Sequence, residues 1–167
     1  SLLAVLAISR IYSPSDLGIA AFFIAIASIL SPLSTGKYDF AIFSPESNND
    51  GIKFFFGSIL INFLFSFFVL GAVVILALFF QYDLKWYVVT VFLVFLNGLD
   101  FSFTAWFNRN KEYKFITIAR ILRILSLNIS IILLGLIKSE PFYIMLSNVI
   151  GLFIFNGLLF IIFIKKY

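Results

Sequence analysis

The sequence predicts an all-α membrane protein, a polytopic transmembrane bundle of about six helices of which the first is truncated. Residues 54–82 form an uncharged run of 29 residues, and about 20 apolar residues are enough to cross the hydrocarbon core of a bilayer. The chain is 62% hydrophobic and only 12% charged, whereas soluble domains carry about 25% charged residues. Strands of a membrane barrel need only about 10 residues each, so apolar segments of this length favour helices.

Six apolar segments are expected to form these helices, at approximately 1–8, 14–42, 54–80, 86–107, 115–137 and 141–164. The first is too short to span a bilayer and is typical of the end of a longer helix. The second begins where Ser13 is suited to cap a helix, Pro14 to its first turn and Asp16 to its dipole. Pro32 is expected to kink this helix. Residues 43–53 contain Pro, Ser, Asn, Asp and Gly, which predicts a solvated loop.

The positions of Lys and Arg predict the orientation of the bundle. Nine of them fall on the side of the loop 43–53, and these are Lys37, Lys53, Arg109, Lys111, Lys114, Arg120, Arg123, Lys165 and Lys166. Three fall on the other side, at Arg10, Lys85 and Lys138. Because Lys and Arg are in excess on the cytoplasmic side of membranes, the loop 43–53, the loop 108–114 and the C-terminus are expected to be cytoplasmic.

Tyr and Trp residues lie near the ends of the expected helices, where their amphipathic rings suit the level of the lipid headgroups. Those expected on the outer side are Tyr12, Tyr82, Trp86, Tyr87 and Tyr143. Those expected on the cytoplasmic side are Tyr38, Trp106, Tyr113 and Tyr167.

Polar residues recur at helical spacing along several of these segments. In the segment 86–107 they share one face, and Val88, Phe92, Phe95, Leu99, Phe103 and Trp106 on the opposite face are expected to meet lipid. The segments 14–42, 54–80 and 115–137 carry similar stripes. We therefore expect a shared polar cavity, lined by Ser28, Thr35, Asn62, Asn97, Thr104 and Ser126.

Charges within the expected spans are costly, since an Arg or Asp at the bilayer centre costs about 2.5–3.5 kcal/mol on insertion scales. Asp100 and Arg123 lie at equal depth, about 12 Å from the cytoplasmic ends of neighbouring antiparallel helices, so we expect them to approach each other. Arg120 lies one turn before Arg123, and Asp39 lies near the end of the segment 14–42. Intramembrane charges are functional candidates by default.

Each candidate also has a purely structural interpretation. Asp100 and Arg123 are also consistent with a structural clasp, and Arg120 with a side chain that snorkels to the interface. Lys37 and Asp39 are also consistent with ordinary helix-end charges. The Ser, Thr and Asn residues are more often interhelical hydrogen-bonding groups than ligand contacts.

The absence of Cys and His from the sequence excludes several kinds of chemistry. Thiolate catalysis, His-based zinc sites and a Ser-His-Asp triad are excluded, and no catalytic residue, metal ligand or cofactor is predicted. The net charge of +4 is not concentrated in a basic stripe, so nucleic acid is not an expected partner.

Two stretches of the sequence are similar to one known family. They are Tyr12-Ser13-Pro14-Ser15-Asp16-Leu17-Gly18, with Ser31-Pro32-Leu33 and Lys37-Tyr38-Asp39-Phe40-Ala41-Ile42 beyond it, and Phe107-Asn108-Arg109-Asn110-Lys111-Glu112-Tyr113-Lys114 with Ile118-Ala119-Arg120. The chain thereby resembles bacterial polysaccharide flippases of the O-antigen translocase type, within the multidrug/oligosaccharidyl-lipid/polysaccharide exporter superfamily. The resemblance covers essentially the whole chain.

The resemblance implies a transporter of two six-helix lobes, of which residues 1–167 would be most of the first. It implies the flipping of undecaprenyl-diphosphate-linked oligosaccharides across the bacterial cytoplasmic membrane. The expected partners are this cargo, membrane lipids, the second lobe of the same chain and a polysaccharide polymerase. Arg120 and Arg123 would attract the diphosphate or an acidic sugar, and Asp39 and Asp100 would balance their charge or couple transport to an ion.

Three alternatives stay open beside this function. A drug or small-molecule exporter of the same superfamily would share the fold. A membrane enzyme is disfavoured, because no His and no Asp-x-Asp motif is present. A membrane scaffold without transport activity would tolerate apolar replacements of the inward charges.

Overall fold

The computed structural model describes residues 8–80 and 83–167, and this part of the chain is helical with no strands, as predicted. Its helices are α2 (Pro14–Ser34), α3 (Tyr38–Ala41), α4 (Asn48–Phe80), α5 (Leu84–Arg109), α6 (Tyr113–Ile137) and α7 (Pro141–Lys166). Residues 8–11 are also helical, and the rest of the expected first segment lies outside the described residues. Helices α2, α4, α5, α6 and α7 are each long and apolar enough to cross a membrane, which indicates a multi-pass membrane protein.

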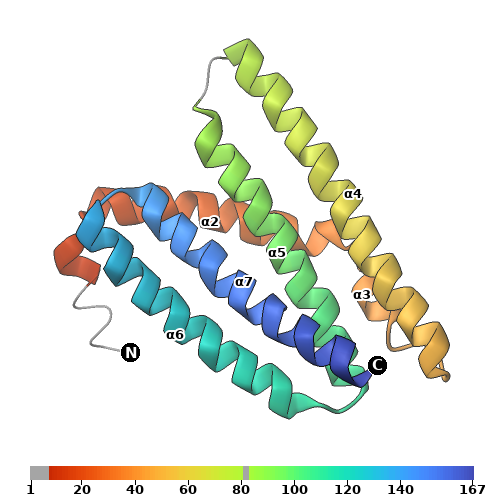
Figure 1. Cartoon of the computed structure of the whole chain (residues 1–167). Coiled ribbons are helices and arrows are strands. Elements are labelled where there is room, and N and C mark those ends of the chain that lie inside the picture. Colours follow the sequence, from red (N-terminus) through yellow and green to blue (C-terminus); the bar gives the residue numbers. More distant parts are fainter. Residues whose placement is uncertain (1–7, 81–82) are drawn as a thin grey trace.

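Helix α5 is the centre of the bundle (Figure 1). It packs against α4 on one side and against α2 and α7 on the other, while α6 packs mainly on α7. Arg109 binds the carbonyls of Ile42 and Ser47, and Lys166 forms an ion pair with Glu112. Residues 42–55, 106–113 and 163–167 therefore share one end of the bundle, which we call the basic end.

The opposite end holds residues 11–13, 84–87 and 131–142. The Tyr12 hydroxyl there donates to the Ile131 carbonyl at 3.2 Å, and the rings of Trp86 and Phe142 lie 5.8 Å apart. The grouping of segments at the two ends is the one that the alternation of helices predicted.

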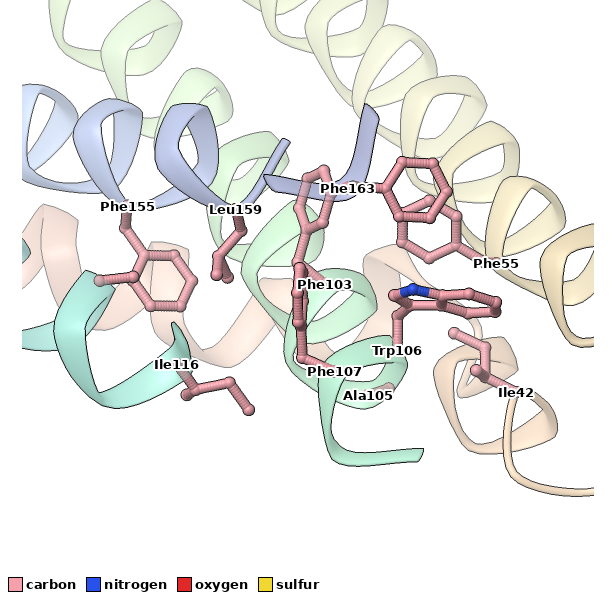
Figure 2. Close-up of a cluster of buried hydrophobic side chains, with 11 residues drawn as sticks. Ile42, Phe55, Phe103, Ala105, Trp106, Phe107, Ile116, Phe155, Leu159 and Phe163 are labelled. Atoms are coloured by element: carbon pink, nitrogen blue, oxygen red, sulfur yellow. The ribbon is translucent and has the colours of Figure 1, made fainter. Parts of the chain in front are cut away.

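The apolar face of α5 is not a lipid-facing surface along its whole length, which corrects the prediction. Phe103 and Trp106 are 3% and 0% exposed and belong to a core cluster at the basic end. Figure 2 shows the rings of Phe55 and Phe163, from α4 and α7, beside Trp106. A helix with neighbours on both sides buries its apolar face as well as its polar face, so amphipathicity alone did not identify the lipid side.

Two aromatic residues expected at the headgroup level are instead buried in protein. They are Trp106, in the cluster of Figure 2, and Tyr12, which is 2% exposed. Tyr82 lies outside the described residues.

The break after α2 is sharper than the expected kink. The segment 14–42 divides into α2, which ends at Ser34, and the short helix α3. Pro32 has no N–H to donate to the preceding turn, and Gly36 follows the C-cap residue Thr35 with φ of 56°. A glycine at this position ends a helix readily, because the left-handed conformation costs it little.

Helix α4 begins six residues before the expected start at 54, inside the predicted loop. The Ser47 hydroxyl accepts a hydrogen bond from the Asp50 N–H at 3.1 Å, and Lys53 pairs with Asp50 at 2.8 Å. This cap satisfies a backbone donor of the first turn and extends the helix through a polar segment. Helix α2, in contrast, starts as predicted, with a capping box between Ser13 and Asp16.

Small and polar residues hold α2, α4 and α5 together. The Ser58 and Ser102 hydroxyls bond each other at 2.7 Å, and the Asn62 amide donates to the Phe95 carbonyl at 2.9 Å. A Cβ added at Gly98 would lie 2.2 Å from Asn62 Oδ1 and 2.6 Å from Ser34 Oγ. Gly98 is therefore required by the close approach of the three helices.

We predict that Gly98→Ala destabilises the bundle, by about 1–3 kcal/mol, because the added methyl group forces Asn62 or Ser34 to move. The measurement is the temperature at which the detergent-solubilised protein loses its monodisperse elution peak. Gly71→Ala is the matched control, since nothing lies within 4 Å of a Cβ there. Equal melting temperatures for the two variants would contradict the close packing.

Candidate functional site

The expected approach of Asp100 and Arg123 is confirmed. Arg123 Nη1 on α6 lies 2.7 Å from Asp100 Oδ2 on α5, and the Thr104 hydroxyl donates to Asp100 Oδ1 at 2.9 Å. Both carboxylate oxygens are thus engaged. The side chains are 12% and 28% exposed for Asp100 and Arg123, so this is a largely buried pair within two helices that can span a membrane.

Three helices position the Arg123 side chain. Its guanidinium lies 6.0 Å from the centroid of the Phe155 ring on α7. A Cβ added at Gly151, also on α7, would lie 3.2 Å from the Arg123 carbonyl and 3.6 Å from its Cγ. Gly151 therefore lets α6 approach α7 closely, and from there Arg123 reaches across to α5. Since α6 packs mainly on α7, the ion pair is a direct link between α6 and α5.

Arg120 has a different environment from Arg123. It lies one turn earlier on α6, is exposed, and forms no ion pair with a carboxylate among the described residues. Large apolar side chains are exposed on the same helix, and they include Ile118, Ile121, Leu122, Leu125 and Ile129. An uncompensated arginine on a helix of this kind is costly in hydrocarbon, so its surroundings in the membrane must be polar.

Asp39 does not join the Asp100–Arg123 pair. Its Oδ1 accepts a hydrogen bond from the buried Thr35 hydroxyl at 2.8 Å, across the break between α2 and α3. A hollow of about 130 Å³ beside it is lined by Pro32, Thr35, Lys37, Asp39, Phe40 and Phe101. No ion pair joins Asp39 to Arg120 or Arg123 in the described chain.

The six residues expected to line a shared cavity are spread over the bundle. Asn62 is fully buried and bonded to α5, so it is a packing residue, which corrects the prediction. Thr35 lines the small hollow at the α2–α3 break. Ser28, Asn97 and Ser126 donate to carbonyls of their own helices, and Thr104 donates to Asp100. The polar spacing of single helices predicted that these groups would face a common cavity. Each of them instead bonds to a protein group near it, so they do not gather at one site.

Sequence reasoning missed the role of Arg109. Its guanidinium donates to the carbonyls of Ile42 and Ser47, and its Cζ would lie 2.9 Å from a Cβ at Gly51. This arginine therefore holds the connection between α3 and α4 against the end of α5. An arginine in the last turn of a helix gave no sequence signal for this contact beyond a favourable dipole interaction.

Comparison of the chain with protein-family models, with curated proteins and with solved structures gives no match.

We predict that Asp100 and Arg123 are energetically coupled. Asp100→Asn and Arg123→Gln should each lower the free energy of unfolding by about 3 kcal/mol, because each leaves a largely buried charge without its partner. The double variant should be milder than the sum of the two, by about 0.5–3 kcal/mol. Thermal unfolding of all four proteins measures this coupling. Strictly additive changes would mean that the ion pair adds no stability.

Proposed function

We propose that the chain is part of a membrane transporter, the first lobe of a bacterial flippase for undecaprenyl-diphosphate-linked oligosaccharides. The observation that carries the proposal is the Asp100–Arg123 pair inside the membrane-spanning bundle, with the exposed Arg120 one turn away. Guanidinium groups match phosphate oxygens in geometry and charge. The site carries two cations and one carboxylate, so it retains a net positive charge for an anionic cargo.

The two arginines have distinct roles in this proposal. Arg120 is unpaired among the described residues and makes the first contact with the diphosphate. Arg123 is shared between Asp100 and the cargo, so the cargo must compete with Asp100 for it. Protonation of Asp100, or its binding of a cation, would release Arg123 to the cargo. This competition supplies a means of coupling cargo binding to an ion gradient, with Asp39 as a second acidic candidate.

The second lobe would cover the exposed face of α2. Gly18, Ala21, Ala25 and Ser28 form an exposed strip of small residues along this face, beside the exposed side chains of Phe22 and Ile29. Membrane helices associate through such small residues, because they allow the backbones to approach closely. A cavity between the two lobes would then shelter the hydrated headgroup from hydrocarbon.

We predict that Arg120→Ala and Arg123→Ala each reduce flipping by about tenfold or more, because each removes a charged hydrogen bond to the diphosphate. Transport of a fluorescent lipid-linked oligosaccharide in proteoliposomes measures the effect, and surface polysaccharide assembly reports it in cells. Arg10→Ala, at the opposite end, is the control and should transport normally. Arg120→Lys should retain part of the activity, since it keeps the charge.

Normal polysaccharide assembly in both alanine variants, at normal expression, would refute the proposed roles of the arginines. Loss of drug resistance without a polysaccharide defect would instead favour the small-molecule exporter. A protein that moves no cargo in proteoliposomes, and whose apolar replacements of Asp100 and Arg123 leave polysaccharide assembly intact, would instead be a scaffold.

The proposal includes an orientation, with the basic end in the cytoplasm, based on nine against three Lys and Arg. Residues 1–167 contain no Cys, so a cysteine introduced there is the single thiol of this part of the protein. We predict that in intact cells a membrane-impermeant maleimide labels Ser139→Cys but not Asn49→Cys, and that both are labelled after lysis. Both residues are exposed, at opposite ends of the bundle. Labelling of Asn49→Cys in intact cells would invert the orientation.

A further inference from the structure

The hollow at the break between α2 and α3 also borders α5, which contributes Phe101 to its lining. Its volume of about 130 Å³ is below the range of about 300–1,000 Å³ that is usual for a site enclosing a whole ligand. The hollow therefore receives one small cyclic group of a ligand, while the rest of the ligand lies outside it.

Aromatic, acidic, basic and hydroxyl groups meet in this lining. Asp39 Oδ1 accepts the hydrogen bond from Thr35, whereas Asp39 Oδ2 has no partner among the described residues. Lys37 forms no ion pair within the same part of the chain, and its Nζ lies 5.5 Å from the centroid of the Phe40 ring. The Phe101 ring is 38% exposed and stacks on no other described ring. The hollow thus offers a carboxylate oxygen, an ammonium group and an aromatic face.

This combination favours a sugar ring over other small groups. The Lys37 ammonium group disfavours a metal cation, and the Asp39 carboxylate disfavours an anion, because both charges line the same hollow. A purely apolar group would leave both charges without a partner. The hydroxyls of a neutral sugar can donate to a carboxylate and accept from an ammonium group. The C–H groups on one side of its ring suit the negative face of an aromatic ring.

The hollow is next to the arginine site along α5. Phe101 directly follows Asp100, and at about 100° per residue Asn97 and Thr104 lie between them around the helix. Asn97 and Thr104 are only partly buried, so this arc of α5 is accessible. In a diphosphate-linked oligosaccharide the first sugar is bonded directly to a phosphate, so the two groups require neighbouring sites. Asp100 and Phe101 provide such neighbours.

The depth of the hollow indicates what it faces. Phe101 lies eight residues before the end of α5 at Arg109, a rise of about 12 Å. Asp39 and Lys37 line the hollow together with this ring. Charged groups within the spanning part of a bundle are costly against lipid. We therefore expect the hollow to open toward the polar cavity between the two lobes.

We propose that the hollow at the α2–α3 break binds the first sugar of the cargo, the one that is bonded to the diphosphate. The sugar ring stacks on Phe101, and its hydroxyls donate to Asp39 Oδ2 and accept from Lys37. This inference rests on the proposed function, because it takes the diphosphate to be held by Arg120 and Arg123. It adds a contact that recognises the sugar itself, which the arginines do not provide.

The experiment compares the binding of two lipids to the full-length protein in nanodiscs. One is undecaprenyl diphosphate that carries only the first sugar of the host cell's surface polysaccharide, and the other is undecaprenyl diphosphate without a sugar. We expect the wild-type protein to bind the sugar-bearing lipid about tenfold more tightly, the equivalent of one or two good contacts. Phe101→Ala should reduce this ratio about fivefold and leave the affinity for the sugar-free lipid unchanged.

Further variants separate the sugar contacts from the fold. Asp39→Asn should reduce the ratio about threefold, because it replaces a charged acceptor by a neutral one. Phe101→Tyr keeps the aromatic face and should stay within about twofold of the wild-type ratio. Phe68→Ala is the matched control, since Phe68 is 76% exposed on α4, and it should leave both affinities unchanged. Elution as a single monodisperse species establishes that each variant is folded.

The failure of the sugar site and the failure of the proposed function give different results. If the wild-type protein binds neither lipid, the proposed function is wrong and the sugar site with it. If Arg120→Ala weakens both lipids but the wild-type protein binds them equally, the proposed function stands and the sugar site is wrong. A Phe101→Ala variant that weakens both lipids by the same factor would also refute the sugar site. So would an Asp39→Asn variant that loses a dependence on Na⁺ without a change in the ratio, because Asp39 would then bind a cation.

Discussion

Within hydrocarbon, a polar side chain can form hydrogen bonds only with the protein, and this requirement organises the bundle around α5. The polar contacts that we describe between spanning helices all end on that helix. Asn62 of α4 and Asn156 of α7 donate to its carbonyls at Phe95 and Leu96, Ser58 bonds Ser102, and Arg123 pairs with Asp100. These contacts surround α5 on different sides, which explains why it is the most buried helix.

The same requirement gives the ion pair a double character. Asp100 and Arg123 lower each other's cost of burial and join α6 to the centre of the bundle. A charge that is balanced by only one partner is also sensitive to any competitor for that partner. A structural contact and a binding site for an anionic cargo are therefore compatible in the same residues.

Prediction from the sequence succeeded where the relevant signal was local or depended only on helical rise. The capping box of Ser13 and Asp16 and the equal depth of Asp100 and Arg123 are examples. It failed where the answer depended on the number of neighbours that a helix has. Nothing in the segment 86–107 shows that Trp106 meets Phe55 and Phe163 instead of lipid. Two local signals also account for differences from the predicted bounds, because Gly36 ends α2 early and Ser47 caps α4 ahead of residue 54.

Helix α4 has 33 residues, a length of about 50 Å at 1.5 Å per residue, against a hydrocarbon core of about 30 Å. It cannot stand upright within the bilayer, so it must lean or extend into water at its polar first turns. Arg109 lies over Gly51 in those turns and fixes them to the end of α5. Hydrophobic mismatch with a thinner or thicker bilayer therefore cannot slide α4 along its neighbour, and the two helices must change their tilt together.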